Sequence, residues 1–277
     1  MILGQKEAIA RLLQDNDPET VRLVKEQLAA AGEDMRGDLA VLAAFEDEHV
    51  SRHAREVLDL ITDREAEDEF TLLCHLFGDH HDLERANWML ARALLPGLEV
   101  TPFETKVNSW GRQFLLKSSG AVSSRERVLL RANFMSEELG FRGNTEDYYS
   151  ERNCLLPCVI DTRMGIPITL TLLYMMVAAR AGMCVEGINL PGHFIARHGD
   201  LYFDPFHRGR ILTKGDCVAI LAKQNLSLQK AHLADATARQ ILIRVLANLL
   251  YVFDLKHEPE NHEKVNAWIR ALTTECC

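Results

Sequence analysis

The chain has 277 residues, of which 47% are hydrophobic and 26% charged, proportions typical of a soluble globular protein with a substantial core. Its formal net charge of −9 argues against a general surface for nucleic acids or anionic membranes. The longest apolar run, 166–179, is interrupted by Thr169 and Thr171 and is too short to cross a bilayer, and the N-terminus lacks a signal-peptide core. We therefore expect neither a nucleic-acid nor a membrane partner.

Cysteine usage indicates a reducing environment. The seven cysteines are an odd number without the spacing of a disulfide framework, so reduced thiols and a cytoplasmic location are expected. They are Cys74, Cys154, Cys158, Cys184, Cys217, Cys276 and Cys277. The last two are expected to lie in a mobile tail.

Residues 1–68 are predicted to form antiparallel helices. Asp17 and Pro18 give a helix cap followed by a proline in the first turn, with apolar residues at helical spacing on either side. Residues 15–32 resemble a HEAT-type repeat, but at most about one and a half copies are present, fewer than a free-standing array needs. We expect a HEAT-like appendage whose charged face is either solvated or a partner surface. The acidic run 63–68 is expected to start a helix or form a linker.

The next segment is predicted to be helical, with helices near 83–95, 103–116 and from Ser123 or Ser124 to Glu138. A histidine-rich stretch precedes them, consisting of His75, His80, His81 and Asp82. Adjacent histidines point in different directions on a helix and no ligand spacing is present, so a loop and helix cap is favoured over a metal site. We expect no bound metal or cofactor.

An acidic, aromatic loop follows at 145–153. Tyr148 and Tyr149 could floor a substrate groove, or they could anchor the loop on the core, which is favoured. Asn153 is expected to cap a short helix over 154–162. Cys154 and Cys158 are four positions apart and would share one face of that helix.

The stretch 165–206 is the most informative part of the chain. Pro167 opens an almost wholly apolar segment, predicted to be a buried helix that ends at Gly182. Strands are then predicted over residues 183–190, 193–197 and 201–204. A two-residue turn at Gly199-Asp200 would join the last two.

The length of that turn decides which side chains meet. With two residues in the turn, Ile195 lies opposite Asp204, and His193 becomes a diagonal neighbour of Asp204 on the same face. An aspartate that accepts from one ring nitrogen would fix the tautomer of a histidine whose other nitrogen acts as a base. Equally, His193 could cap the turn after Pro191-Gly192 while Asp204 starts a turn of its own.

Several segments carry a family resemblance. GIPITLTLLYMMVAARAGM, LPGHF and YFDPF, preceded by LGFRGNTEDYYSERN, resemble the transglutaminase-like core of the SirB family over about residues 83–226. The resemblance implies a papain-like α+β fold, with a helix packed on a small antiparallel sheet. In active transglutaminase-like enzymes a Cys at the start of that helix works with a His and an Asp on adjacent strands. His193 and Asp204 match the last two, whereas the helix start reads Pro167-Ile168-Thr169.

Two kinds of residue could replace the missing cysteine. Thr169 lies near the start of the helix, but a threonine hydroxyl is a weak nucleophile, and pairing with backbone is favoured. Cys154 or Cys158 could be a displaced nucleophile served by His193. They could also be metal ligands completed by His193, although burial as packing residues is the commonest fate of free cysteines.

The remainder is predicted to be mainly helical. Arg208, in the basic patch 207–210, could hold an anionic or amide substrate or could belong to a solvated turn. A helix is expected over 213–221. Residues 231–277 are predicted to form a helical hairpin, which in the family resembles an abbreviated tetratricopeptide-type pair.

The sequence thus predicts a helix-rich α+β protein in three parts: HEAT-like helices (1–68), a transglutaminase-like core with its leading helices (69–230) and a C-terminal hairpin (231–277). The absent cysteine favours a non-catalytic scaffold or regulatory protein that binds a protein partner. The alternative is a papain-like cysteine hydrolase or acyltransferase acting on a peptide or amide substrate, with His193 as base and Asp204 orienting it. A metal-binding domain that uses His193, Asp204 and a cysteine is a weaker third interpretation.

Overall fold

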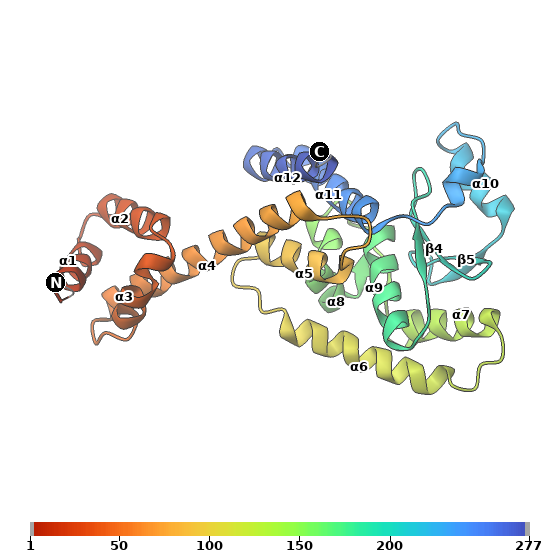
Figure 1. Cartoon of the computed structure of the whole chain (residues 1–277), viewed down its shortest axis with the longest axis horizontal. Coiled ribbons are helices and arrows are strands. Elements are labelled where there is room, and N and C mark those ends of the chain that lie inside the picture. Colours follow the sequence, from red (N-terminus) through yellow and green to blue (C-terminus); the bar gives the residue numbers. More distant parts are fainter. Residues whose placement is uncertain (1–2, 275–277) are drawn as a thin grey trace. The chain divides into compact units, whose positions relative to one another are not determined.

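The computed structural model describes residues 3–274, and for residues 3–5 the backbone alone (Figure 1). Cys276 and Cys277, predicted to lie in a mobile tail, are outside the described residues. The chain divides into two compact units. The first runs up to Phe70 and includes Arg92–Leu98, and the second comprises Thr71–Ala91 and the chain from Glu99 onward.

The first unit is built from short helices. They are α1 (Leu3–Leu13), α2 (Pro18–Ala30), α3 (Glu33–Ala43) and the first part of α4 (Glu48–Leu76). Asp17 caps α2 as expected, because its carboxylate accepts the N–H groups of Glu19 and Thr20. A core of apolar side chains joins the four helices, including Leu13, Ala29, Leu39, Leu42, Val50, Val57 and Ile61.

Helix α4 corrects the prediction for the acidic run 63–68, which lies inside this 29-residue helix and neither starts a helix nor forms a linker. The reason is that buried apolar residues continue at helical spacing through the run, from Ile61 to Ala66 and Phe70. The acidic residues occupy the other positions, where Glu65 pairs with Arg36 at 2.5 Å.

The remaining helices are α5 (Leu83–Leu94), α6 (Thr101–Ser118), α7 (Ser124–Asn133), α8 (Leu156–Thr162), α9 (Pro167–Arg180), α10 (Lys214–Ala222), α11 (Ala238–Leu255) and α12 (Pro259–Thr273). The helix predicted from Ser123 or Ser124 to Glu138 is interrupted. It is capped by Ser123 but changes at Phe134 into a π-helical turn that ends at Glu138. Helices α11 and α12 pack against each other. None of the helices within residues 3–274 is both long and apolar enough to cross a lipid bilayer.

Helix α9 lies at the centre of the second unit. It packs against α6, α8, α11 and strands β3 and β4, so most of its side chains are buried, as its composition predicts. Pro167 stands in its first turn, and Gly182, with φ of 68°, follows its last turn in the left-handed conformation.

A four-stranded antiparallel sheet lies beside α9. Its strands, in spatial order, are β3 (Glu186–Ile188), β4 (Ile195–His198), β5 (Leu201–Asp204) and β6 (Arg210–Leu212). The predicted two-residue turn at Gly199-Asp200 is confirmed, because His198 pairs with Leu201 and Ala196 with Phe203. This register places Ile195 and Asp204 at the next opposing positions.

Two strand boundaries differ from the prediction. The strand expected over 183–190 is limited to three residues, and the one expected to begin at His193 begins at Ile195. The chain turns before it, since Gly192 has φ of 78° and the His193 N–H donates to the Leu190 carbonyl at 2.9 Å. His193 therefore reaches its neighbours from a turn.

The two faces of the sheet are covered differently. Helix α10 closes one face over an apolar cluster made of Ile188, Leu190, Ile195, Leu212, Cys217 and Leu221. On β5, Phe203 lies against the ring of Tyr174 from α9 and beneath the guanidinium of Arg131 from α7, 4.6 Å from the ring centre. Burial lowers the pKa of Arg131 to about 10, and the electrostatic effect of Tyr174, which raises this pKa, offsets part of the shift.

A short parallel pair, β1 (Arg142–Gly143) with β2 (Met164–Gly165), holds the loop that follows β5. The Gly143 N–H donates to the Phe206 carbonyl at 3.1 Å. A Cβ atom at Gly143 would lie 2.6 Å from the Phe206 ring. The absence of a side chain at Gly143 is therefore what lets Phe206 pack here.

We expect Gly143→Ala to lower the free energy of unfolding by about 1–3 kcal/mol, because the added methyl group forces the Phe206 ring to move. Urea denaturation monitored by circular dichroism measures the change. The matched control is Gly215→Ala in α10, where the nearest atom would be 3.5 Å away and the helix favours alanine. Equal unfolding midpoints for Gly143→Ala and the unmodified chain would contradict the packing described.

Candidate functional site

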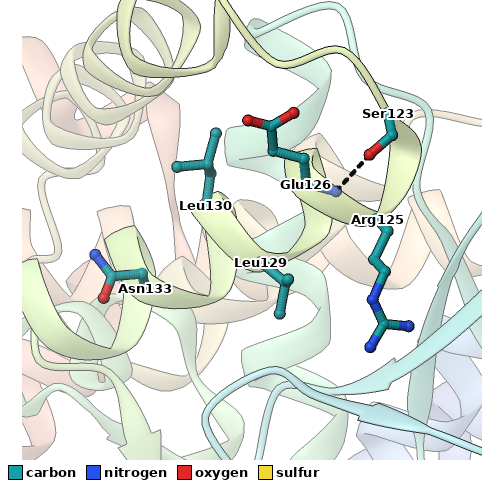
Figure 2. Close-up of a pocket in the computed structure, with 6 residues that line it drawn as sticks. All are labelled: Ser123, Arg125, Glu126, Leu129, Leu130 and Asn133. Carbon is teal, nitrogen blue, oxygen red and sulfur yellow. Dashed lines mark hydrogen bonds between the residues drawn. The ribbon is translucent and has the colours of Figure 1, made fainter.

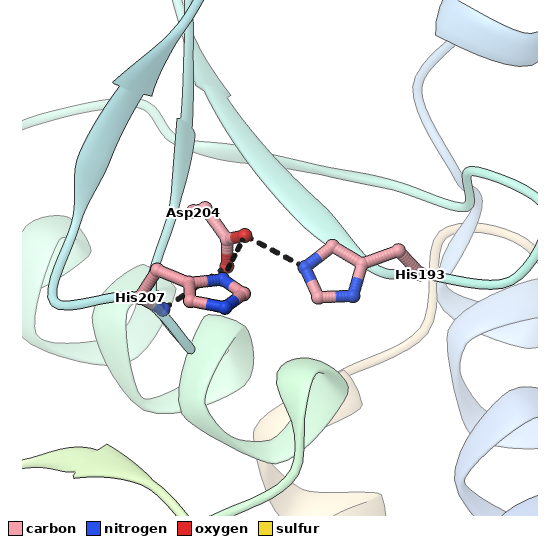
Figure 3. A group of neighbouring side chains, drawn as sticks. All are labelled: His193, Asp204 and His207. Atoms are coloured by element: carbon pink, nitrogen blue, oxygen red, sulfur yellow. Dashed lines mark hydrogen bonds and ion pairs between the residues drawn. The ribbon is translucent and has the colours of Figure 1, made fainter. Parts of the chain in front are cut away.

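Three side chains meet at the end of β5 (Figure 3). The Nε2 atom of His193 and the Nδ1 atom of His207 each lie 2.7 Å from the same carboxylate oxygen, Oδ2 of Asp204. The Asp204 side chain is 3% exposed, that of His193 13% and that of His207 60%. The cluster is thus buried at its carboxylate and open to solvent at His207.

The second oxygen of Asp204 organises the turn that follows β5. Oδ1 accepts the N–H groups of Phe206 at 3.0 Å and His207 at 3.3 Å, while the Asp204 carbonyl accepts the Gly209 N–H at 2.7 Å. Arg208 and Gly209 both have positive φ, which turns the chain back into β6. Asp204 therefore both starts a turn and pairs with His193. The sequence suggested these two roles as alternatives, and they are compatible.

The charge state of Asp204 follows from these contacts. Burial raises the pKa of its carboxyl group, but the hydrogen bonds and charge of His193 and His207 outweigh burial, so the pKa lies below its ordinary value. An ionised carboxylate has no hydrogen to donate. Both imidazole nitrogens that face Oδ2 must therefore be donors.

The hydroxyl of Thr169 at the start of α9 is already hydrogen-bonded. Thr169 is fully buried, and its hydroxyl group donates to the carbonyl oxygen of Asn153 at 2.6 Å and lies 3.2 Å from that of Ile166. This is the backbone pairing that the sequence favours. The ring of His193 is hydrogen-bonded to Asp204. Among residues 3–274, no hydrogen bond joins this ring to Thr169 or to a thiol.

The two candidate cysteines are buried as well. Burial raises the pKa of the thiols of Cys154 and Cys158, which works against forming a thiolate. The expectation that both share a face of one α-helix is wrong, because Cys154 ends a 3₁₀ turn (Glu151–Cys154) and Cys158 lies in α8. Their roles as nucleophiles or metal ligands stay predictions.

Asn153 differs from its prediction as a helix cap. The cap position of α8 is Leu155, without a side-chain hydrogen bond. The Asn153 side chain instead accepts from Asn144 at 3.0 Å and donates to the carbonyl oxygens of Asp147 and Tyr148. Its own carbonyl receives the Thr169 hydroxyl, so Asn153 ties the 145–153 loop to the start of α9.

Aromatic rings extend from the cluster to the surface. Phe206 contacts the rings of both His193 and His207 edge-on, and Tyr148 contacts Phe206 at 5.9 Å between ring centres. Tyr149 follows, 54% exposed, and packs on Tyr251, which is 50% exposed. Tyr148 thus anchors the loop, and Tyr149 with Tyr251 forms an exposed aromatic pair.

Arg208, the third predicted substrate-binding residue, is exposed and pairs with Glu137 at 3.2 Å. Its backbone has φ of 56°, within the turn that Asp204 organises. The structure therefore gives Arg208 a place in a solvated turn near the cluster, and its role toward a substrate stays a prediction.

Concave surfaces also lie away from the cluster. A hollow of about 370 Å³ lies along α7 and is lined by Ser123, Arg125, Glu126, Leu129, Leu130 and Asn133. Figure 2 shows these residues, with the Glu126 N–H donating to the hydroxyl oxygen of Ser123. The first unit has a groove of about 1000 Å³ with charges of both signs, including Arg22, Lys25, Glu26, Asp47, Arg52 and Arg64. None of the predicted site residues lines either surface.

Sequence reasoning missed His207 as a member of the cluster. Its position three residues after Asp204, in a segment that begins Asp-Pro, is the available signal, since such a turn folds residue i+3 back over the aspartate. Among residues 3–274, this is also the one group of at least three His, Cys, Asp or Glu side chains whose ligand atoms converge. The histidines near Gly78 do not form one: His81 accepts the Gly78 N–H, and Asp82 caps α5.

Comparison with known proteins gives several relatives. A UPF0162 protein of Xylella fastidiosa is 31% identical over 177 residues, which cover 60% of this chain and 62% of the relative. A UPF0162 protein of Pseudomonas aeruginosa is 32% identical over 184 residues, 64% of this chain and 66% of the relative. F-box only protein 21 of Mus musculus is 30% identical over 142 residues, 47% of this chain and 22% of the relative.

The matched region covers less than two thirds of the length of the Xylella relatives, at 62% and 66%. No solved structure matches the chain. The family model described as the transglutaminase-like superfamily matches residues 104–247, just over half of the chain, and this range contains α9, the sheet and the His193–Asp204–His207 cluster. The chain therefore belongs to the transglutaminase-like superfamily.

Proposed function

We propose that this chain is a non-catalytic, SirB-like member of its superfamily, in which the transglutaminase-like core is a scaffold or regulatory module that binds a protein partner. The observation that carries the proposal is the start of α9. Where an active relative would place a cysteine, the side chain nearest to that role is Thr169, whose hydroxyl is fully buried and donates to Asn153. A hydroxyl committed in this way cannot be deprotonated by a base without first losing that bond.

Cys154, Cys158 and Cys184 do not offer an activated thiol in its place. A thiol nucleophile needs a lowered pKa, from a nearby cation or an adjacent base. Burial moves the pKa of Cys154 and Cys158 in the opposite direction. Cys184 is exposed, but its hydrogen bond to Glu186, and then partial burial, raise its pKa too.

The His193–Asp204 pair has a structural role that does not require catalysis. Asp204 holds both histidines and the turn into β6, and Phe206 in that turn begins the row of aromatic rings that ends at Tyr149 and Tyr251. Exposed tyrosines are frequent in protein–protein contacts because they bury large area with little loss of conformational freedom. This supports Tyr149 and Tyr251 as part of a surface for a protein or peptide.

The first unit supplies further surface for a partner. Its helices follow one another through short connections, as in HEAT-like pairs, and its groove carries charges of both signs. The match to F-box only protein 21 occupies 22% of that protein, which supports the core as a module that functions within different chains. We assign the interaction role to the flanking helices and the tyrosine pair together.

The second candidate is a papain-like cysteine hydrolase or acyltransferase for a peptide or amide substrate. The observation that favours it is the 2.7 Å contact between His193 and Asp204, which is the base-and-orienter geometry of such enzymes. It requires a thiol to approach the free Nδ1 of the His193 ring. The two candidates therefore differ in whether any cysteine responds to His193.

Cysteine reactivity separates the two candidates. We expect Cys154 and Cys158 to react slowly with iodoacetamide, and no cysteine to form a thiolate well below the ordinary pKa of roughly 8.5. His193→Ala should leave each rate–pH profile unchanged, as should the control His80→Ala at an exposed position. Mass spectrometry of peptides gives the rate at each site. A thiol that reacts at low pH in the unmodified chain and in His80→Ala, but not in His193→Ala, would instead support the cysteine enzyme.

The structural role of Asp204 has a pH signature. The pKa of Asp204 is lower in the folded chain than in the unfolded chain, where it is about 3.9. The ionised carboxylate therefore stabilises the folded chain fully above that value, and this stabilisation is lost as the pH falls through the lower, folded pKa. We expect Asp204→Asn to be about 1–3 kcal/mol less stable at neutral pH. The difference in the free energy of unfolding between Asp204→Asn and the unmodified chain should shrink below a pH of about 4.

Urea unfolding across this pH range measures that gap. Asp59→Asn, at an exposed position in α4, is the matched control and should remain close to the unmodified chain at neutral pH. A stability difference for Asp204→Asn that stays constant from neutral to acidic pH would contradict the assignment of the stabilisation to an ionised carboxylate.

A further inference from the structure

We propose that His193, Asp204 and His207 form a binding site for one divalent first-row transition ion, with Zn²⁺ as the reference ion. The proposal goes beyond the scaffold function and does not depend on it. It rests on the convergence of Nε2 of His193, Oδ2 of Asp204 and Nδ1 of His207, which all lie within 4.8 Å of one another.

The donor set suits such an ion. Two imidazole nitrogens and one carboxylate oxygen are borderline donors of the kind that Zn²⁺ and its neighbours bind, whereas Mg²⁺ and Ca²⁺ prefer oxygen alone. Three protein ligands leave one position open, and the 60% exposure of the His207 side chain gives the site access to solvent. One carboxylate and two neutral imidazoles would leave a bound divalent ion with a net charge of +1.

The carboxylate is preorganised for this role. Its Oδ1 atom is held by the N–H groups of Phe206 and His207, and Oδ2 faces a nitrogen of each ring (Figure 3). Hydrogen bonds to the non-ligating oxygen are the usual support of a ligating carboxylate. Phe206 packs edge-on against both rings and shields the site on that side.

Binding requires a small rearrangement with a defined proton balance. Bonds of about 2.0–2.1 Å at tetrahedral angles place ligand atoms about 3.3 Å apart, so the two 2.7 Å contacts must lengthen slightly. The hydrogen on each facing nitrogen must leave that atom, and a neutral ring takes up the other tautomer, with its hydrogen on Nδ1 of His193 or Nε2 of His207 and no net release of a proton. A ring that is doubly protonated before binding releases one proton to the buffer.

The test is titration of the full chain, dialysed against EDTA, with Co²⁺ and Zn²⁺. We expect one Co²⁺ per chain, seen as visible d–d absorption of a low-symmetry site, and displacement of Co²⁺ by Zn²⁺. Removal of any one ligand, by His193→Ala, Asp204→Asn or His207→Ala, should weaken binding at least about 100-fold. Because His207 is exposed, His207→Ala is expected to fold normally, which circular dichroism checks.

The control is His80→Ala, which removes an exposed histidine from the rival stretch near Gly78 and should leave the titration unchanged. Saturating Zn²⁺ should raise the thermal unfolding midpoint of the unmodified chain and of His80→Ala, but not that of His207→Ala. This stability readout does not depend on any activity.

Three results would overturn the proposal. They are absence of binding to the unmodified chain, binding that survives His207→Ala, and a near-ultraviolet charge-transfer band that shows cobalt on a thiolate. The scaffold proposal fails on a different result, a thiol made reactive by His193, so the outcomes of the two experiments can be told apart.

Discussion

The local structure depends most on the buried carboxylate of Asp204. One oxygen accepts two backbone N–H groups and so shapes the turn from β5 to β6, and the other accepts from His193 and His207. A buried charge is tolerated when every lone pair is used in this way. Because a single side chain serves both tasks, the geometry of the histidines and the path of the loop change together.

The core places His193 and Asp204 in the geometry of a base and its orienter, while the hydroxyl of Thr169 at the start of α9 is already hydrogen-bonded. A base and its orienter need only hydrogen-bond geometry, which the β4–β5 hairpin supplies. A nucleophile needs in addition an exposed, activated atom, and the start of α9 commits Thr169 to the carbonyl of Asn153. The same side chains that would serve an enzyme therefore lock loop 145–153 and the β5–β6 turn onto the core, beside the exposed tyrosines.

Much of this could be predicted from the sequence, where local rules decide. The two-residue turn at Gly199-Asp200 sets the hairpin register, and with it the His193–Asp204 contact. His207 was missed because it meets Asp204 through the turn after the end of β5, which strand alternation does not describe. The acidic run in α4 was misread because burial of Ala66 and Phe70, which keeps the helix continuous, depends on tertiary packing.

The most direct test of this account is the position of the hydrogens on the two rings. In metal-free chain labelled with ¹⁵N-histidine, long-range ¹H–¹⁵N NMR should show hydrogen on Nε2 of His193 and on Nδ1 of His207, and both signals should shift in Asp204→Asn. A His193 ring whose Nε2 lacks hydrogen could not donate to Asp204. That result would contradict the central place given to the carboxylate.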